Sequence, residues 1–215
     1  MGFKPGLMSE KLIIETFYLP NTYILSLCKR YPKVYIEAWE HYQKGGFRNR
    51  CYIANANGVQ VLSIPLRKGK HEGLSIREVA IAYEESWQKK HWKAIESAYR
   101  NAPYFDHYAP HFEAIYSQKF TYLFDFNLAL WECLINNIGL KLKLNLSADY
   151  QKDYPPNEVH DHRNLWKPNK NLRVGESMPN LGSYPQVFTE KHGFLSNLSS
   201  LDLLFCMGPE AFYFL

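Results

Sequence analysis

The dipeptide Asn57-Gly58, set between two runs of alternating residues, constrains this chain more than any other feature. Asn-Gly accepts two successive positive φ angles and therefore favours a two-residue type I′ turn between antiparallel strands. A turn at these residues pairs Ala54 with Val61. Because directly opposed residues point to the same side of a sheet, the predicted hairpin has one apolar face. That face consists of Cys51, Ile53, Leu62 and Ile64.

Other segments show strand or helix patterns on both sides of this hairpin. Strands are predicted at 11–19, 34–36, 76–83 and 141–147, with a short helix capped by Asn21. Helices are predicted at 87–102, after Pro110, at 122–138 and from Ser199 onward. We therefore expect one α+β domain over residues 1–215, with an N-terminal antiparallel or mixed sheet that includes the hairpin. A central helical group follows, and a C-terminal helix packs back on both. Residues 150–185, rich in Pro, Asn and Gly, are expected to be irregular and either functional or mobile.

The composition argues against several classes of protein. A net charge of +4 and a pI near 8.7 are too mild for a dedicated nucleic-acid binder, so no nucleic-acid partner is expected. The chain has no apolar run of the ~18 residues that a membrane span needs and no N-terminal signal pattern, so we expect a cytoplasmic location. Four scattered cysteines without a CxxC pair support neither a disulfide framework nor a cysteine zinc site. Walker, GxGxxG, GxSxG and HExxH motifs do not occur, so the cofactor is unknown.

Charged residues before the hairpin are the first candidates for a functional site. Arg50 is the strongest candidate for binding an anion, because a guanidinium group matches phosphate or carboxylate with two hydrogen bonds. Its structural alternative is an ion pair with Glu37 or Glu40. Glu37 and Glu40 are candidate catalytic residues, because two carboxylates can supply an acid and a base if their environments differ. Their structural alternative is to pair with Lys44 and Arg48.

Two polar residues fall within the apolar stripes of predicted helices. His91 is a candidate acid or base, and the alternative is a core histidine with one hydrogen-bond partner. Asn127 must bond to the protein or to a ligand, since a buried amide without partners costs roughly 1–3 kcal/mol. His160 and His162 share one side of an extended chain, but a third ligand at a diagnostic spacing is missing, so no metal site is expected.

Several motifs occur in the order typical of one protein family. They are FYLP at 17–20, RNRC at 48–51, LSIPL at 62–66, ESAYRNAPYF at 96–105, DFN at 125–127, YPQVF at 184–188 and LSSLDLLFCMGPEA at 198–211. On these motifs the chain resembles WbqC-like proteins, in particular the shorter type from Bacteroidetes. The family pattern falls on Tyr18, Pro20, Lys44, Asn49, Arg50, Pro65, His91, Tyr99, Pro103, Asn127 and Asp202.

The resemblance implies a role in O-antigen or other surface-polysaccharide synthesis, as a transferase of an acyl or aminoacyl group onto a sugar or nucleotide sugar. In this hypothesis Arg50 and Lys44 hold a phosphate or carboxylate, and Asn49 orients the substrate. His91 is the acid or base, oriented by Glu37 or Glu40. The resemblance adds two further substrate-binding residues, Tyr18 and Asn127. The expected partner is a small molecule (a sugar, a nucleotide sugar or an acyl donor). The alternative is a non-catalytic protein that binds another enzyme of the same pathway.

Overall fold

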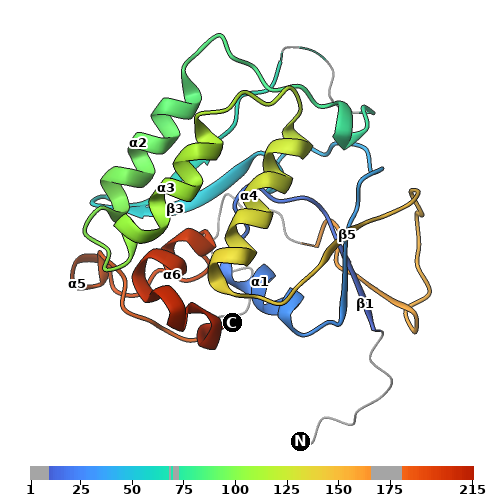
Figure 1. Cartoon of the computed structure of the whole chain (residues 1–215). Coiled ribbons are helices and arrows are strands. Elements are labelled where there is room, and N and C mark those ends of the chain that lie inside the picture. Colours follow the sequence, from blue (N-terminus) through green and yellow to red (C-terminus); the bar gives the residue numbers. More distant parts are fainter. Residues whose placement is uncertain (1–9, 68, 70–72, 166–180) are drawn as a thin grey trace, which may run out of the picture.

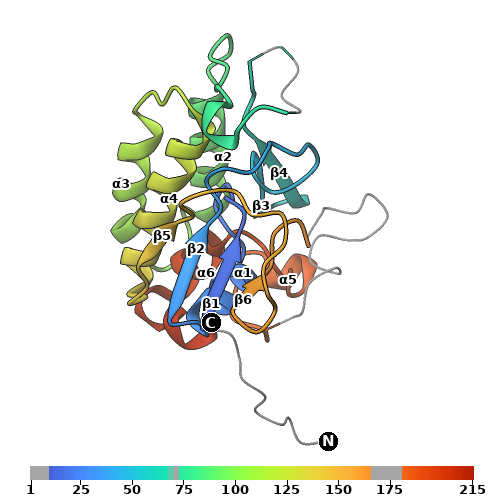
Figure 2. The same ribbon diagram turned by 90° about the vertical axis from the view of Figure 1, so that its right-hand side faces the viewer.

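Four short strands form a parallel sheet. The computed structural model describes residues 10–67, 69, 73–165 and 181–215. The strand order is β5-β2-β1-β6, and every neighbouring pair is parallel. Figure 2 shows these strands side by side. Their bounds are Lys11–Ile14 for β1, Lys33–Ile36 for β2, Leu144–Leu146 for β5 and Val159–Asp161 for β6.

Helix α1 (Thr22–Lys29) connects β1 to β2 and explains their parallel pairing, because parallel strands need a crossover connection. The side chain of Asn21 accepts a hydrogen bond from the backbone N–H of Ile24 at 3.0 Å, so the helix begins at the predicted cap. The α+β class is confirmed. The arrangement of strands differs from the expected one, since the N-terminal sheet is parallel throughout and the antiparallel hairpin stands apart from it.

The hairpin consists of β3 (Arg50–Asn55) and β4 (Gly58–Ser63). Its turn lies one residue earlier than predicted, at 56–57, so the pairing of the strands is shifted by two residues. Ala54 pairs with Val59 and not with Val61. The reason is that only the glycine of the Asn-Gly pair has a positive φ, 110° at Gly58. A single glycine with positive φ directly after a tight turn is another common geometry for a short hairpin, besides the type I′ turn with two positive φ angles. The apolar face is as predicted, because Cys51, Ile53, Leu62 and Ile64 are all buried.

Three helices form the central group, as the sequence predicts. They are α2 (Trp87–Tyr99), α3 (Phe105–Tyr116) and α4 (Leu123–Ile138). Figure 1 shows them side by side, with the parallel sheet beyond α4. Helix α2 packs against α3 and β3, and α3 packs against α4. The C-terminal helix α6 (Ser200–Met207) contacts α3, α4 and β3, so it packs back as expected.

Three further elements complete the described structure, and two sequence predictions need correction. The short helices η1, α5 and η2 span Ile76–Glu78, Thr189–His192 and Gly208–Phe214. The segment 76–83 was expected to be a strand, but it begins with η1 and continues through isolated bridges at Ala80 and Ile81. Pro110 lies inside α3 and does not precede it. Of the irregular segment 150–185, residues 166–180 lie outside the described ranges, and the part before them contributes β6. The described helices include none long and apolar enough to cross a membrane.

The turn geometry predicts different costs for two neighbouring substitutions. Gly58→Ala is expected to lower the free energy of unfolding by about 1 kcal/mol, because a side chain disfavours positive φ. A Cβ at this position would meet no atom within 4 Å, so the cost is conformational and not steric. Asn57→Ala is the control and should change stability by less than about 0.5 kcal/mol. Urea denaturation measures both, and equal costs would contradict the observed register.

Candidate functional site

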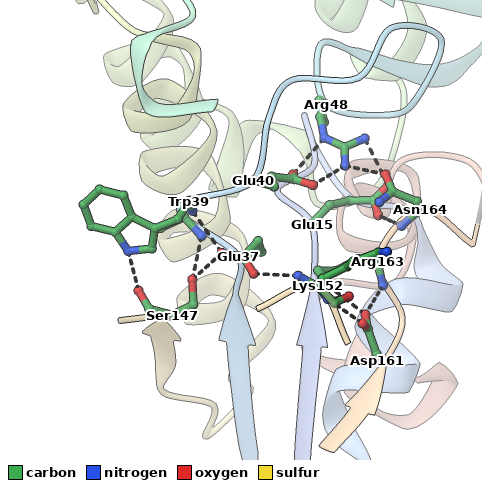
Figure 3. A network of polar contacts seen from close by, with 11 residues as sticks. Glu15, Glu37, Trp39, Glu40, Arg48, Ser147, Lys152, Asp161, Arg163 and Asn164 are labelled. Carbon is green, nitrogen blue, oxygen red and sulfur yellow. Dashed lines mark hydrogen bonds and ion pairs between the residues drawn. The ribbon is translucent and has the colours of Figure 1, made fainter. Parts of the chain in front are cut away.

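Polar residues that follow all four parallel strands meet at one edge of the sheet. Glu15 follows β1, Glu37 follows β2, Ser147 follows β5, and Arg163 lies two residues beyond the end of β6. Figure 3 shows these side chains converging above the strand ends. The strand order places a change of direction between β1 and β6, because the chain first moves from β1 to β2 and β5 and then returns. In open parallel sheets, ligands bind outside the carboxyl ends at such a switch point.

Glu37 is fully buried and holds one half of this network together. One carboxylate oxygen accepts hydrogen bonds from the backbone N–H of Trp39 at 2.9 Å and from the Ser147 hydroxyl at 2.6 Å. The other oxygen accepts a bond from Nη1 of Arg163 at 2.8 Å. Arg163 also binds the Asp161 carboxylate and donates to the backbone oxygen of Lys152 at 3.2 Å. The network therefore ties the ends of β2, β5 and β6 to one another.

Arg48 forms the other half and is only 1% exposed. Its Nε and Nη2 donate to the Glu40 carboxylate at 2.8 and 2.5 Å, and Nη2 also donates to the Asn164 side-chain oxygen at 2.7 Å. A Glu15 oxygen lies 3.6 Å from Nη1. Burial disfavours the charged guanidinium, but the bonds and charge of Glu40 outweigh that effect and raise the pKa of Arg48. Arg48 therefore stays charged. Burial raises the pKa of Glu40, and the bonds and charge of Arg48 offset only part of this effect.

The second candidate region is a pocket of about 510 Å³ between the end of β4 and helix α2. Pro65, Leu66 and Trp87 give it apolar walls. Lys90 forms an exposed ion pair with Glu85 at the pocket, with a separation of 2.5 Å. This mixture of apolar walls and a few polar groups is common in small-molecule sites.

His91 lines this pocket and is 8% exposed. Its Nδ1 lies 2.9 Å from the hydroxyl of Tyr18, which lies 2.5 Å from the hydroxyl of Tyr116. Burial lowers the pKa of His91 to about 4, and the backbone carbonyl of Ser63 beside the ring offsets only part of this effect. The imidazole is therefore neutral at pH 7. The Tyr18 bond fixes the orientation of the ring.

The predicted substrate-binding residues are spread around the hairpin. Arg50 lies opposite Ser63 in the ladder and is half-buried, next to Tyr52. The Asn49 side chain donates to the backbone oxygen of Ile64 at 3.0 Å and accepts a bond from the Tyr42 hydroxyl at 3.2 Å. These bonds fix the start of β3. Lys44 is exposed in the preceding loop.

Asn127 lies in α4 and is fully buried. Its side-chain nitrogen donates to the backbone oxygen of Arg48 at 2.7 Å. Within the described residues, its side-chain oxygen is buried without a hydrogen-bond partner. A buried amide at this position was expected to need a hydrogen bond. The bond that it makes ties α4 to the loop that carries Arg48.

The structure separates the predicted catalytic residues into two groups. Glu37 and Glu40 bind Arg163 and Arg48 at the sheet edge, whereas His91 binds Tyr18. The alternative interpretation of Glu40 as the partner of Arg48 is thus confirmed. Sequence analysis missed Arg163, because its partner Glu37 is 126 residues away in the chain.

A third buried polar cluster surrounds Asp202 in α6. Ser199 caps the helix, accepting a bond from the backbone N–H of Leu201 at 3.3 Å. The Asp202 side chain accepts bonds from the Tyr184 hydroxyl at 2.7 Å and from the Gln186 amide at 2.8 Å. Burial raises the pKa of Asp202 to about 6, although these bonds favour its charged form. Two family motifs therefore meet here, YPQVF and LSSLDLLF.

Comparison with known proteins agrees with the resemblance seen in the motifs. The profile of the WbqC-like protein family matches residues 17–162, which is more than half of the chain. The chain belongs to the WbqC-like protein family. The match includes the His91 pocket and part of the sheet-edge network, namely Glu37, Glu40, Arg48 and Ser147, whereas Glu15, Arg163 and Asn164 lie just outside it. Membership in this family points to a role related to polysaccharide biosynthesis and to no particular reaction.

A relative of this WbqC-like chain is the uncharacterized protein Rv1507c of Mycobacterium tuberculosis (strain ATCC 25618 / H37Rv). The two sequences are 28% identical over 145 residues, which cover 67% of this chain and 62% of the relative. The chain thus spans less than two thirds of that protein. Solved structures give no significant match.

The sheet-edge network predicts a non-additive pair of substitutions. Arg48→Met should lower the free energy of unfolding by about 3–5 kcal/mol, because it leaves the Glu40 carboxylate buried without its counter-ion. Adding Glu40→Leu removes that carboxylate, so the double variant should be more stable than Arg48→Met alone. Arg100→Met is the control, since Arg100 is 69% exposed, and it should cost less than about 1 kcal/mol. Urea denaturation measures all three, and purely additive costs would contradict the network.

Asp202 predicts a pH dependence of stability. Its pKa rises from 3.8 to about 6 on folding, so the folded state binds its proton more tightly than the unfolded state. The resulting stabilisation is complete below pH 3.8 and is lost as the pH rises through 6. Between pH 4 and pH 7 the wild type should lose roughly 2 kcal/mol relative to Asp202→Asn, which cannot titrate. Denaturation at several pH values measures the difference, and parallel curves would refute the assignment.

Proposed function

We propose that the protein is a transferase that moves an acyl or aminoacyl group onto a sugar or nucleotide sugar during synthesis of surface-polysaccharide precursors. The observation that carries this proposal is the neutral, oriented imidazole of His91 in the wall of a 510 Å³ pocket. Acyl transfer to a hydroxyl or amine requires a group that accepts the proton of the attacking atom. A neutral histidine can do so without first losing a proton of its own.

In the proposed mechanism Tyr18 is the positioning residue for His91. In this proposal the ring proton lies on Nδ1, which then donates to the Tyr18 oxygen, and Tyr18 donates to Tyr116; the contacts between these atoms allow these roles. Nε2 then carries a lone pair and accepts the proton of the acceptor hydroxyl or amine as this attacks the acyl carbonyl. The Ser63 carbonyl beside the ring favours the imidazolium that forms. The imidazolium returns the proton to the leaving group, so protons and bonds balance over the reaction.

Arg50 is proposed to bind the anionic part of a substrate, such as the phosphates of a nucleotide sugar. Directly opposed strand residues share a face, so Arg50 points to the same side of the hairpin as Ser63, which lines the pocket. Its Nε is buried and has no hydrogen-bond partner among the described residues. Lys44 adds positive charge in the preceding loop, and Asn49 fixes the strand that carries Arg50.

The sheet-edge glutamates have a supporting role in this proposal. Glu40 binds Arg48, two residues before Arg50, so the Glu40 ion pair holds the loop from which Arg50 projects. Glu37 acts one step further away, through Arg163 and Ser147. Tyr18 takes the role of orienting His91 that the sequence analysis gave to these glutamates.

Ligand-induced thermal stabilisation tests the proposal. The panel holds nucleoside diphosphates, nucleotide sugars, acyl-coenzyme A compounds and amino acids. A ligand at 100 times its dissociation constant stabilises the folded protein by about 2.7 kcal/mol. We expect a phosphate-containing ligand to stabilise the wild type and Arg50→Lys more than Arg50→Ala. A panel that leaves the wild type unchanged would overturn the transferase proposal.

His91→Gln and Tyr18→Phe then separate catalysis from binding. With the stabilising ligand and an acyl donor from the same panel, His91→Gln should retain binding and lose transfer by roughly 10²–10⁴-fold. Tyr18→Phe should reduce transfer less and shift the lower limb of its pH profile, because Tyr18 acts through His91. Unchanged transfer in His91→Gln would show that the base lies elsewhere.

A further inference from the structure

Within the described residues, the outer edge of β4 has no strand partner, and the ladder shows which residues point their backbone groups outward. The backbone oxygen of Tyr52 accepts a bond from the N–H of Ser199 at 2.7 Å, so it points away from β4. The N–H of Ala54 also points away, towards the hydroxyl of Tyr99 at 3.2 Å. Residues opposite such positions point their own backbone groups outward as well. These residues are Val61 and Val59.

The side chains of this edge are apolar and exposed. Val59 is 39% exposed and Val61 is 50% exposed. The six residues Gly58–Ser63 contain no charged residue and no proline. Natural edge strands are usually protected by lysine, proline, a bulge or a covering element. In the described part of the chain, β3 is the strand that pairs with β4, and β3 also contacts α2 and α6.

We propose that β4 is a dimer interface, at which the outer edges of β4 from two copies of this chain pair in antiparallel fashion. Val59 of one copy lies opposite Val61 of the other, and the two hairpins become one four-stranded sheet. Four strands with an apolar face are more stable than an isolated two-stranded hairpin.

A second copy suits this edge because the edge is complementary to itself. In the proposed register Val59 of each copy pairs with Val61 of the other copy. The outward-pointing backbone groups of both residues therefore gain partners. The absence of charge in β4 means that two identical strands meet without like-charge repulsion. An isologous contact of this kind closes on itself as a twofold dimer and leaves no edge open for further growth.

Two substitutions of Val61 separate backbone pairing from side-chain contact. The N–H of Val61 points away from β3, so Val61→Pro removes a donor of the outer edge while leaving the hairpin ladder intact. Val61→Thr keeps the donor and the β-branched shape. Sedimentation equilibrium should show a dimer for the wild type and Val61→Thr. Val61→Pro should raise the dimer dissociation constant roughly tenfold or more, because each copy loses a hydrogen bond.

A cross-linking experiment decides the matter even if Val61→Pro fails to fold. The proposed register brings the two Gln60 residues directly opposite each other, at a Cα separation of about 4.5 Å for a pair without mutual hydrogen bonds. This separation suits a disulfide. Gln60→Cys should therefore give a disulfide-linked dimer under mild oxidation. Tyr213→Cys is the control, because Tyr213 is 80% exposed on η2, and it should not cross-link at the same concentration.

Three outcomes would overturn the proposal. The first is a wild type that stays monomeric at the highest concentration at which it remains in solution. The second is a Val61→Pro variant that folds and dimerises as tightly as the wild type, which would assign the dimer to another surface. The third is a Gln60→Cys variant that cross-links no faster than the Tyr213→Cys control.

Discussion

The bidentate ion pair between Arg48 and Glu40 is the interaction on which the rest of the structure depends. The strands of the parallel sheet are three or four residues long, so their ladders alone make few hydrogen bonds. Two buried arginines extend the connections beyond the strand ends. Arg163 joins the ends of β2 and β6, and Arg48 joins the loop before the hairpin to Asn164, just beyond β6. Segments far apart in the chain are thus held by a few charged side chains.

Such a network is costly to build, which bears on its purpose. Burying an ion pair removes two charges from water, and replacing such pairs by apolar residues is often neutral or stabilising. Its benefit here lies in specificity, because a guanidinium group with several fixed acceptors tolerates few alternative loop positions. Arg50 follows Arg48 by two residues, so the position of the proposed anion-binding residue is set by the same pair. A precisely positioned loop is useful where a ligand must be oriented, even though burying the ion pair costs desolvation free energy.

The sequence predicted the parts of the fold that depend on neighbouring residues. The helical stripes of α2 and α4, the cap at Asn21 and the apolar face of the hairpin follow from periodicity and local bonding. The turn position was missed because Asn-Gly is compatible with two turns that differ by one residue in position and therefore by two residues in the pairing of the strands. The parallel sheet was missed although the signal was present, since a helix between two strands indicates a crossover. The ionic network could not be predicted, because Glu37 and Arg163 meet only once the sheet is assembled.

The segment from Glu15 to Asn21 connects the two candidate regions physically. Glu15 contacts Arg48 at the sheet edge, and Tyr18, three residues later, holds His91 at the pocket. Leu19 has a φ of 46°, a strained value for a leucine. Strain of this kind persists only where the surroundings over-determine the backbone.

The required constraints lie on both sides of Leu19. The Phe17 oxygen accepts a bond from the Trp131 indole at 3.1 Å, and the Tyr18 N–H donates to the Phe47 oxygen at 2.9 Å. The Pro20 oxygen accepts a bond from the N–H of Ser200 at 2.8 Å. A displacement of the loop that carries Arg48 would move Phe47 and therefore Tyr18. The orientation of the proposed base thus depends on the same loop as the proposed anion-binding residue, although the two side chains lie in different surroundings.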